Sequence, residues 1–410
     1  MGHDSVSESP PVKTAMLVFL PFAAGYFLSY VYRTVNAVIS PDLVSEFGLS
    51  AASLGLLTSA YFLAFAALQI PVGLMLDRIG PRRTNAWLLL CAGTGAAIFS
   101  MANGVAGLLL GRALIGLGVA AGLMSSIKAF TLWFPLERLP AMTGRMLFIG
   151  GLGAISATVP VEAALQFVDW RGLFRILAAA TFVAAALVFL TVPEKHRDGP
   201  QESLADQFSG TIGVYVSPVF WRLALGTTLF QGINMAVQGL WAGPWLVDVA
   251  GLGRQAVAFH LLALGVATMC GFLFWGALAA RLARRGVSPM SVLIGASAIY
   301  LVVQLVLVFG AGDLALPIWI GWGFFGTSGS LAFAILSQNF PTRLSGRATT
   351  ALNLLVFTTA FASQWGFGAI VNHWPADTGG YQAEGYALAF GVFFILQLCG
   401  FIWLVIGRRK

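Results

Sequence analysis

The chain alternates between long apolar stretches and short polar segments. A helix that crosses the hydrocarbon core of a bilayer, about 30 Å thick, needs about 20 predominantly apolar residues. Twelve stretches meet this requirement and are expected to be membrane-spanning helices: 16–38, 51–75, 85–103, 106–133, 143–166, 171–192, 219–247, 255–282, 289–309, 314–338, 348–371 and 385–407. The first is too long for a cleaved signal peptide and has the wrong flanks. The connecting segments are too short for a separate soluble domain.

The longest polar segment lies near the middle of the chain and begins Pro193-Glu194-Lys195-His196-Arg197. It divides the expected spans into two groups of six, as in transporters built from two helical bundles. We therefore expect the following organisation: a cytoplasmic tail at 1–15, a first six-helix bundle at 16–192, a cytoplasmic linker at 193–218, a second six-helix bundle at 219–407 and a tail at 408–410.

Lys and Arg are unevenly distributed between the two sets of loops. One set, with the C-terminal tail, holds Arg78, Arg82, Arg83, Arg138, Arg145, Lys195, Arg197, Arg281, Arg284, Arg285, Arg343, Arg347, Arg408, Arg409 and Lys410. The other set holds Arg171, Arg175 and Arg254 beside Asp42, Glu46, Asp169, Asp248, Asp313, Asp377 and Glu384. Because basic loops stay in the cytoplasm, we expect both termini there, in a multi-pass protein of the cell (inner) membrane.

Composition agrees with a membrane protein. The chain is 58% hydrophobic and 10% charged, with a mean hydropathy of +0.84, whereas soluble domains carry about 25% charged residues. The net charge of +7 is explained by the basic loops, so no nucleic-acid partner is expected. Three Cys lie in apolar runs and four His are scattered, which predicts neither a disulfide framework nor a metal site. No cofactor is expected either.

The two groups of spans share a pattern. Phe-Pro, Arg and Gly-Arg follow in this order after the fourth and after the tenth span, at Phe134-Pro135, Arg138 and Gly144-Arg145 and at Phe340-Pro341, Arg343 and Gly346-Arg347. A duplicated six-helix unit forms two bundles around a pseudo-twofold axis, with a cavity between them near the membrane midplane. The fold expected is an all-α membrane protein of twelve helices in two pseudo-symmetric bundles.

The loop between the second and third spans carries a specific motif. Gly73, Asp77-Arg78, Gly80 and Arg82-Arg83 resemble the signature loop of the major facilitator superfamily, and Arg112 with Gly116 and Gly118 resembles its second motif. Asp77 lies at a helix end, where it can accept hydrogen bonds from backbone N–H groups and pair with Arg78 or Arg82. We expect a gate that holds the cytoplasmic side closed, formed by Gly73, Asp77, Arg78, Gly80, Arg82, Arg83 and Arg112.

Arg33 is a cation inside the first span. Helical spacing places Tyr26, Tyr30 and Arg33 on one face, adjoined by Asn36. This pattern resembles the anion:cation symporter branch of the superfamily, which implies that Arg33 binds an anionic substrate. The chain departs from the branch at Tyr32, where those members place an acid. The alternative is that Arg33 extends to the headgroups.

Lys128 is a second cation, about 7–8 Å of helix rise inside the end of the fourth span. The segment from Lys128 to Arg138 also resembles the symporter branch, although Val119 stands where those members often carry an acid. Lys128 could receive a substrate carboxylate or phosphate, with Ser125 on the same face. It could instead extend toward the cytoplasmic surface.

Polar and aromatic side chains recur along the seventh span. Gln231, Asn234, Gln238, Trp241 and Trp245 are spaced by 3, 4, 3 and 4 residues, which places them on one face of an α-helix. Because polar side chains are unfavourable against lipid, this face is expected to line the cavity. Such a face can also join helices through hydrogen bonds.

Coupling to protons requires a group whose protonation changes between states. The candidates are Glu162, Asp248 and His260. Glu162 could instead form an ion pair with Arg171 or Arg175. Four further polar residues, Thr327, Ser328, Asn353 and Gln364, are expected to serve mainly in helix packing and interhelical hydrogen bonds.

Two intramembrane cations and few acids predict an electropositive cavity. We expect a secondary active transporter of a small organic anion, such as a carboxylate- or phosphate-bearing metabolite. The symporter resemblance implies alternating access and proton-coupled uptake, with a proton or another coupling ion and membrane lipid as partners. A monomer is expected.

The alternative is a proton-driven exporter of drugs or amphipathic metabolites, which the aromatic residues would suit. Residues 150–160 in the fifth span, however, lack the Gly-Pro motif of such exporters. A membrane-embedded enzyme would need clustered His, Asp and Glu, so no catalytic site is expected. A sensor is disfavoured because the tails are short.

Overall fold

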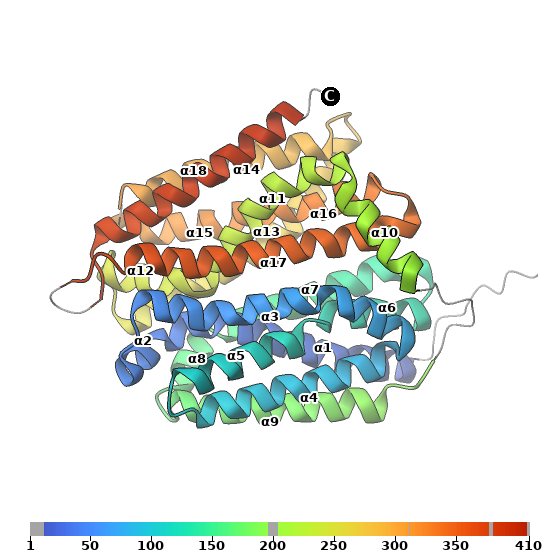
Figure 1. Ribbon diagram of the computed structural model, residues 1–410, viewed down its shortest axis with the longest axis horizontal. Coiled ribbons are helices and arrows are strands. Elements are labelled where there is room, and N and C mark those ends of the chain that lie inside the picture. The colour runs from blue at the N-terminus through green and yellow to red at the C-terminus, as the bar shows by residue number, and fades with distance from the viewer. Residues whose placement is uncertain (1–11, 196–203, 311, 377–379, 408–410) are drawn as a thin grey trace, which may run out of the picture.

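The structure is a computed structural model that describes residues 12–195, 204–310, 312–376 and 380–407. Parts of both predicted tails and of the predicted linker lie outside the described residues. The described chain is almost entirely helical, and most helices run along the long axis of the molecule (Figure 1).

Between residues 12 and 195 the chain forms nine α-helices and a short 3₁₀ turn: α1 Val12–Thr34, α2 Asn36–Phe47, α3 Ala51–Arg78, α4 Gly80–Met101, α5 Val105–Val119, α6 Gly122–Trp133, η1 Leu136–Arg138, α7 Leu139–Ser156, α8 Val159–Ala164 and α9 Trp170–Thr191. Several expected spans are broken. The first is α1 followed by α2, the fourth is α5 followed by α6, and the fifth is α7 followed by α8.

The second half contains the remaining elements: α10 Leu204–Val216, α11 Pro218–Ala236, η2 Val237–Trp241, α12 Ala242–Asp248, α13 Arg254–Ala283, α14 Pro289–Val308, η3 Gly312–Leu314, α15 Ala315–Gly326, η4 Thr327–Ser330, α16 Leu331–Gln338, α17 Thr342–Val371 and α18 Ala383–Gly407. Of these, η2 is one turn of π-helix, whereas η3 and η4 are 3₁₀ turns.

The protein is a multi-pass membrane protein. Among the described residues, ten helices are long and apolar enough to cross a bilayer, and an eleventh is added if the bent pair Gly210–Val216 and Pro218–Asp248 is one span. The apolar part of α7 is shorter, at Ala141–Ser156. In lipid, a helix satisfies its own backbone hydrogen bonds, which explains the absence of strands from the described chain apart from one isolated bridge. Twelve spans are consistent with this arrangement and stay a prediction.

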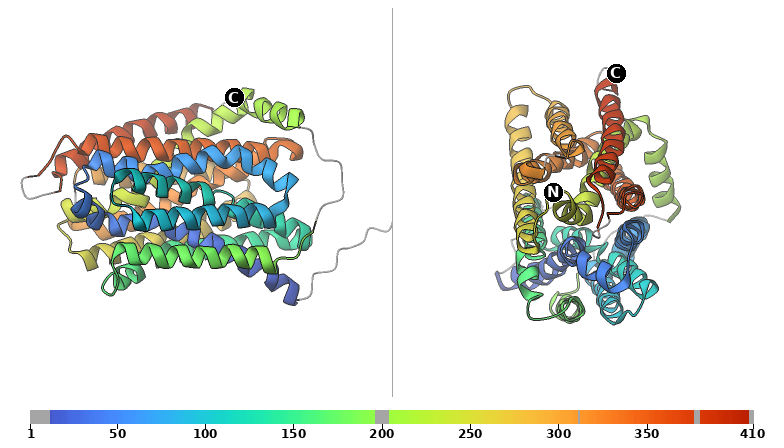
Figure 2. Two further views of the ribbon diagram at one scale, coloured as in Figure 1. Left: turned by 60° about the horizontal axis from the view of Figure 1, so that its bottom comes forward. Right: turned by 90° about the vertical axis from the view of Figure 1, so that its left-hand side faces the viewer.

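The two halves of the chain lie side by side. In Figure 1, α1–α9 occupy one side of the molecule and α11–α18 the other, and the end-on view in Figure 2 shows the same division. We call the contact between them the seam; α3 packs against α17 along it, and α7 against α13. One end of the molecule carries Asp42 and Asp248 and is called the acidic end. The other carries Asp77 and Arg82 and is called the basic end.

Glycines allow the halves to approach closely at the acidic end. A Cβ on Gly55 of α3 would lie 2.8 Å from the carbonyl oxygen of Gln364, and one on Gly368 of α17 would collide with the carbonyl oxygen of Ala51. Backbone therefore meets backbone here, as small residues permit in membrane helix pairs.

Candidate functional site

Arg33 lies at the seam, halfway along the neighbouring helices. Its guanidinium carbon is 4.5 Å from the ring centroid of Tyr30, 5.7 Å from that of Phe65 and 5.3 Å from that of Phe357. Phe65 and Phe357 are near the middle of α3 and α17, which belong to different halves. The side chain therefore faces the interior at mid-depth rather than reaching the headgroups. The helical segment also continues beyond the expected span, through α2 to Phe47.

Arg33 has no ion-pair partner among the described residues. Its Nε is buried and has no hydrogen-bond partner among the described residues. A cation deep in a membrane protein is unfavourable unless it is paired or serves a substrate. The described structure therefore provides a cation at mid-depth that a carboxylate or phosphate could neutralise.

Tyr30 lies beside Arg33, and Tyr26 lies beside Tyr30 one turn earlier on α1. Their hydroxyls are 3.3 Å apart, and the rings meet edge to face with centroids 5.1 Å apart. Gly150 of α7 makes room for them, because a Cβ there would lie 2.7 Å from the Tyr26 ring. The two hydroxyls add hydrogen-bonding groups to this region.

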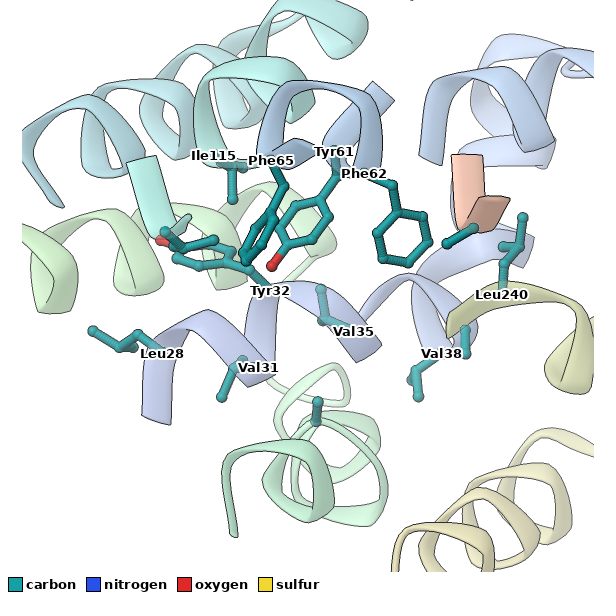
Figure 3. Packing of buried hydrophobic residues seen from close by; sticks show 14 of the residues in the cluster. Leu28, Val31, Tyr32, Val35, Val38, Tyr61, Phe62, Phe65, Ile115 and Leu240 are labelled. Atoms are coloured by element: carbon teal, nitrogen blue, oxygen red, sulfur yellow. The ribbon is translucent and has the colours of Figure 1, made fainter. Parts of the chain in front are cut away.

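Asn36 contacts Arg112 rather than completing the Arg33 face. With the Asn36 amide oriented so that its oxygen faces Arg112, that oxygen lies 2.9 and 3.2 Å from two guanidinium nitrogens. Arg112 also donates to the carbonyl oxygen of Tyr32, at 3.0 Å, and lies over the ring of Tyr61. It is buried. Arg112 thus stabilises the break between α1 and α2, whose surroundings are shown in Figure 3.

Lys128 lies at the basic end and not beside Arg33. Its Nζ is 2.7 Å from the carboxylate of Asp77. Asp77 lies twelve residues beyond Phe65 on α3, or about 18 Å of helix rise. Ser125, expected on the same face, is buried and its hydroxyl has no partner among the described residues. The expected pairing of Lys128 with substrate is therefore replaced by an ion pair within the first half.

The expected gate residues between Gly73 and Arg83 lie on the same stretch of chain as Asp77 but make different contacts from those predicted, whereas Arg112 lies at the break between α1 and α2. Asp77 pairs with Lys128 instead of Arg78 or Arg82. Arg82 donates to the carbonyl oxygen of Phe189, at 2.8 Å, and Arg83 pairs with Glu194, also at 2.8 Å. Arg78 and Gly73 are exposed. Gly80 has φ +78°, a conformation that glycine favours, and forms the turn from α3 into α4.

The seventh span does not keep its five polar and aromatic residues on one face. The π-helical turn η2 contains Gln238 and Trp241 and shifts the register that an uninterrupted α-helix would have. Asn234 lies within the second half, near Tyr300, whereas Trp241 donates to the carbonyl oxygen of Gln364 at 2.9 Å.

The other three residues of this set also contact protein. Gln231 donates to the carbonyl oxygen of Gly329, at 2.6 Å, and Trp245 packs edge to face on Trp319. Gln238 bonds to Thr268 and lines a small pocket at the seam, with Thr34 and Ala154 of the first half. Most of these five residues therefore contribute to helix packing, and of the five only Gln238 lines that pocket.

Glu162 joins an ion-pair cluster that crosses the seam at the acidic end. Its carboxylate is 2.7 Å from Nε of Arg254, the first residue of α13. The same guanidinium donates twice to Asp42 of α2, at 2.7 and 3.0 Å. Glu162 is thus an ion-pair residue, but its partner is Arg254 rather than Arg171 or Arg175.

The two other coupling candidates, Asp248 and His260, also have hydrogen-bond partners. Asp248 accepts from the hydroxyl of Tyr386 at 2.7 Å and from the backbone N–H of Tyr381 at 3.1 Å. The Tyr381 hydroxyl accepts from the backbone N–H of Ala51, at 2.6 Å, and so connects this group across the seam. The Nδ1 atom of His260 is 2.7 Å from the carbonyl oxygen of Ala256.

Sequence reasoning missed most residues that cross the seam. Asn353 donates to Gln69 at 2.7 Å, and Gln364 donates to Thr58 at 2.6 Å, so both act in interhelical bonds as expected. The sequence analysis does not predict the contact of Gln69, although a lone amide in an apolar span indicates an interhelical hydrogen bond. Phe65 and Phe357 carry no such signal, because phenylalanine is common throughout the spans.

The comparisons with known proteins agree on the family and the fold. Residues 22–364 match the sequence profile described as Major Facilitator Superfamily. A probable sulfoacetate transporter of Cupriavidus necator is 28% identical over 45% of this chain and 44% of its own length. A probable L-galactonate transporter of Escherichia coli is 25% identical over 65% of this chain and 60% of its own length. The alignments thus span about half of these relatives.

A solved structure shows the same fold. The crystal structure of a bacterial homologue of the human lysosomal transporter Spinster, in an inward-facing, occupied conformation, has a TM-score of 0.80 at 17% identity and covers 98% of each chain. The family and these relatives are transporters rather than enzymes. The names of the two relatives agree with the resemblance to the anion:cation symporter branch.

Proposed function

Because the chain belongs to the Major Facilitator Superfamily, we propose that it is a secondary active transporter of a small organic anion. The observation that carries this proposal is Arg33, a cation without an ion-pair partner among the described residues, at mid-depth in the seam. The relatives named for sulfoacetate and L-galactonate support an anionic substrate. Arg33 would hold the carboxylate or phosphate, with Tyr26 and Tyr30 beside it.

We further propose alternating access with proton-coupled uptake, in the inner membrane, with the basic end toward the cytoplasm. The Arg254 cluster closes the acidic end of the seam in this structure, and a substrate would enter from that end after the cluster separates. Lys128 and Asp77 belong to the gate at the basic end rather than to the substrate site.

Reconstituted protein tests the role of Arg33. A panel of labelled organic anions is screened by counterflow, which detects exchange of a solute without chemical change. Charge-assisted hydrogen bonds contribute about 1.5–3 kcal/mol, so Arg33→Gln should weaken anion binding by about 10- to 150-fold. Arg285→Gln, at an exposed position in the turn after α13, is the matched control.

Equal transport by Arg33→Gln and Arg285→Gln would overturn the proposed site. Inward proton movement that accompanies anion uptake would support symport. Efflux of amphipathic compounds against their gradient, without anion uptake, would instead support the exporter alternative.

A further inference from the structure

Aromatic rings from three helices surround the Arg33 guanidinium. Tyr30 comes from α1, Phe65 from α3 and Phe357 from α17, with centroids 4.5–5.7 Å from the guanidinium carbon. Tyr61 extends the group through its contact with Phe65, at 6.1 Å between centroids. Figure 3 shows Tyr61 and Phe65 projecting from α3 toward α1. The walls next to the cation are therefore largely faces and edges of rings.

Two of these rings form a stack that crosses the seam. The Phe65 and Phe357 centroids are 3.9 Å apart and their planes differ by 13°. Because the two residues belong to different halves, separating the halves must part this stack. Each ring would then present a flat apolar face beside Arg33.

The polar side chains nearest along the same helices are bonded to protein. Gln69, one turn from Phe65, accepts from Asn353, one turn from Phe357, at 2.7 Å. On the other side, Thr58 accepts from Gln364 at 2.6 Å. These bonds cross the seam on both sides of the aromatic stack, and they occupy the side-chain oxygen of Gln69 and the hydroxyl of Thr58, which a polyhydroxylated solute would otherwise use. The side-chain oxygen of Gln364 is buried and has no partner among the described residues.

We propose that the transported anion is a carboxylate with a flat apolar body, such as an aryl-substituted acid, rather than a polyhydroxylated sugar acid. This inference rests on the proposed function and specifies the substrate class of the Arg33 site. Arg33 binds the carboxylate, while Phe65 and Phe357 determine specificity by taking the apolar body between them, in place of their own stack. Hydroxyl groups placed against these rings would lose hydrogen bonds to water without replacement.

The test compares two anions of the same charge on the purified full-length protein. Phenylacetate represents a flat apolar body and galactonate a polyhydroxylated one; phenylacetamide controls for the ring without the charge. Binding is measured by thermal shift and transport by counterflow. We expect phenylacetate to bind at least about tenfold more tightly than galactonate, because galactonate would bury hydroxyl groups without hydrogen-bond partners. Phenylacetamide should bind far more weakly than phenylacetate, because it lacks the negative charge.

Two substitutions test whether Phe65 and Phe357 cause the preference for phenylacetate over galactonate. Phe65→Leu and Phe357→Leu keep an apolar side chain but remove the ring, and each should reduce the phenylacetate-to-galactonate affinity ratio by about three- to tenfold. Phe272→Leu, at an exposed position on the outer face of α13, is the matched control. Retained thermal unfolding profiles show that the variants are folded, and the ratio measured on one variant cancels any general loss of activity.

The outcomes separate this inference from the proposed function. Arg33-dependent binding of galactonate that equals or exceeds that of phenylacetate overturns the apolar substrate class and leaves the anion site intact. An affinity ratio unchanged in both Phe→Leu variants overturns the assignment of the two rings. If neither anion binds and Arg33→Gln has no effect with any anion of the panel, both proposals fail.

Discussion

At the scale of single residues, two arginines in the first half have different roles because different groups surround them. Arg112 is buried with acceptors for its guanidinium, the Tyr32 carbonyl oxygen and the Asn36 amide. Arg33, only three residues from Asn36, has rings around it and a buried Nε without a partner. Similar sequence contexts, a cation within an apolar run, therefore lead to a structural residue in one case and a candidate ligand-binding residue in the other.

Arg112→Lys tests the structural role. Lysine keeps the charge but cannot present the planar fork of donors that reaches both acceptors. A buried carbonyl left without a donor costs about 1–3 kcal/mol, so the apparent melting temperature in detergent should fall. Arg285→Lys, in the exposed turn after α13, should leave the melting temperature unchanged. Equal melting temperatures for the two variants would contradict the role assigned to Arg112.

At the scale of elements, breaks in the helices decide which side chains meet. An uninterrupted helix would keep Gln231, Asn234 and Trp241 on one face, but the π-helical turn η2 redirects the end of the seventh span toward α17. Periodicity is a local signal, and it holds only while the helix is regular. Apolar runs thus predict where membrane-spanning helices lie, ten or eleven of which the described residues contain, whereas the π-turn and the break at Val35 could not be predicted.

The contact between α3 and α17 yields a prediction at this scale. A Cβ on Gly368 would collide with the carbonyl oxygen of Ala51, whereas a Cβ on Gly366 would lie 3.8 Å from its nearest neighbour, the Phe393 ring. Gly368→Ala should therefore force the helices apart and destabilise the closed acidic end by about 1–3 kcal/mol. The matched variant Gly366→Ala should leave the stability of the closed acidic end unchanged. Thermal unfolding measures both, and an equal effect of the two substitutions would contradict the close approach.

At the scale of the whole molecule, charged residues close the acidic end of the seam. Arg254 of the second half pairs with Asp42 and Glu162 of the first half, while the Lys128–Asp77 pair at the basic end lies within the first half. Movement of the halves apart at the acidic end must break the first cluster but can leave the second pair intact.

Arg254→Ala should shift the protein toward a state open at the acidic end. Spin labels at Val44 on α2 and Leu314 in η3, both exposed, would report the separation of the halves by pulsed electron paramagnetic resonance. Loss of the cluster leaves Asp42 and Glu162 without their partner, so longer distances should become populated. Arg284→Ala at the basic end is the control. An unchanged distance distribution in Arg254→Ala would show that the cluster does not hold the halves together.

The sequence by itself determined the membrane setting, the approximate spans, the family and the candidacy of Arg33, because long apolar runs, motif spacing and the cost of a buried cation are properties of short segments. Tertiary structure alone decided the partners. It placed Lys128 beside Asp77, Glu162 beside Arg254, and Phe65 against Phe357, contacts that join segments 51, 92 and 292 residues apart. Such pairings depend on how rigid helices pack side by side, and hydrophobic periodicity does not encode which helix faces which.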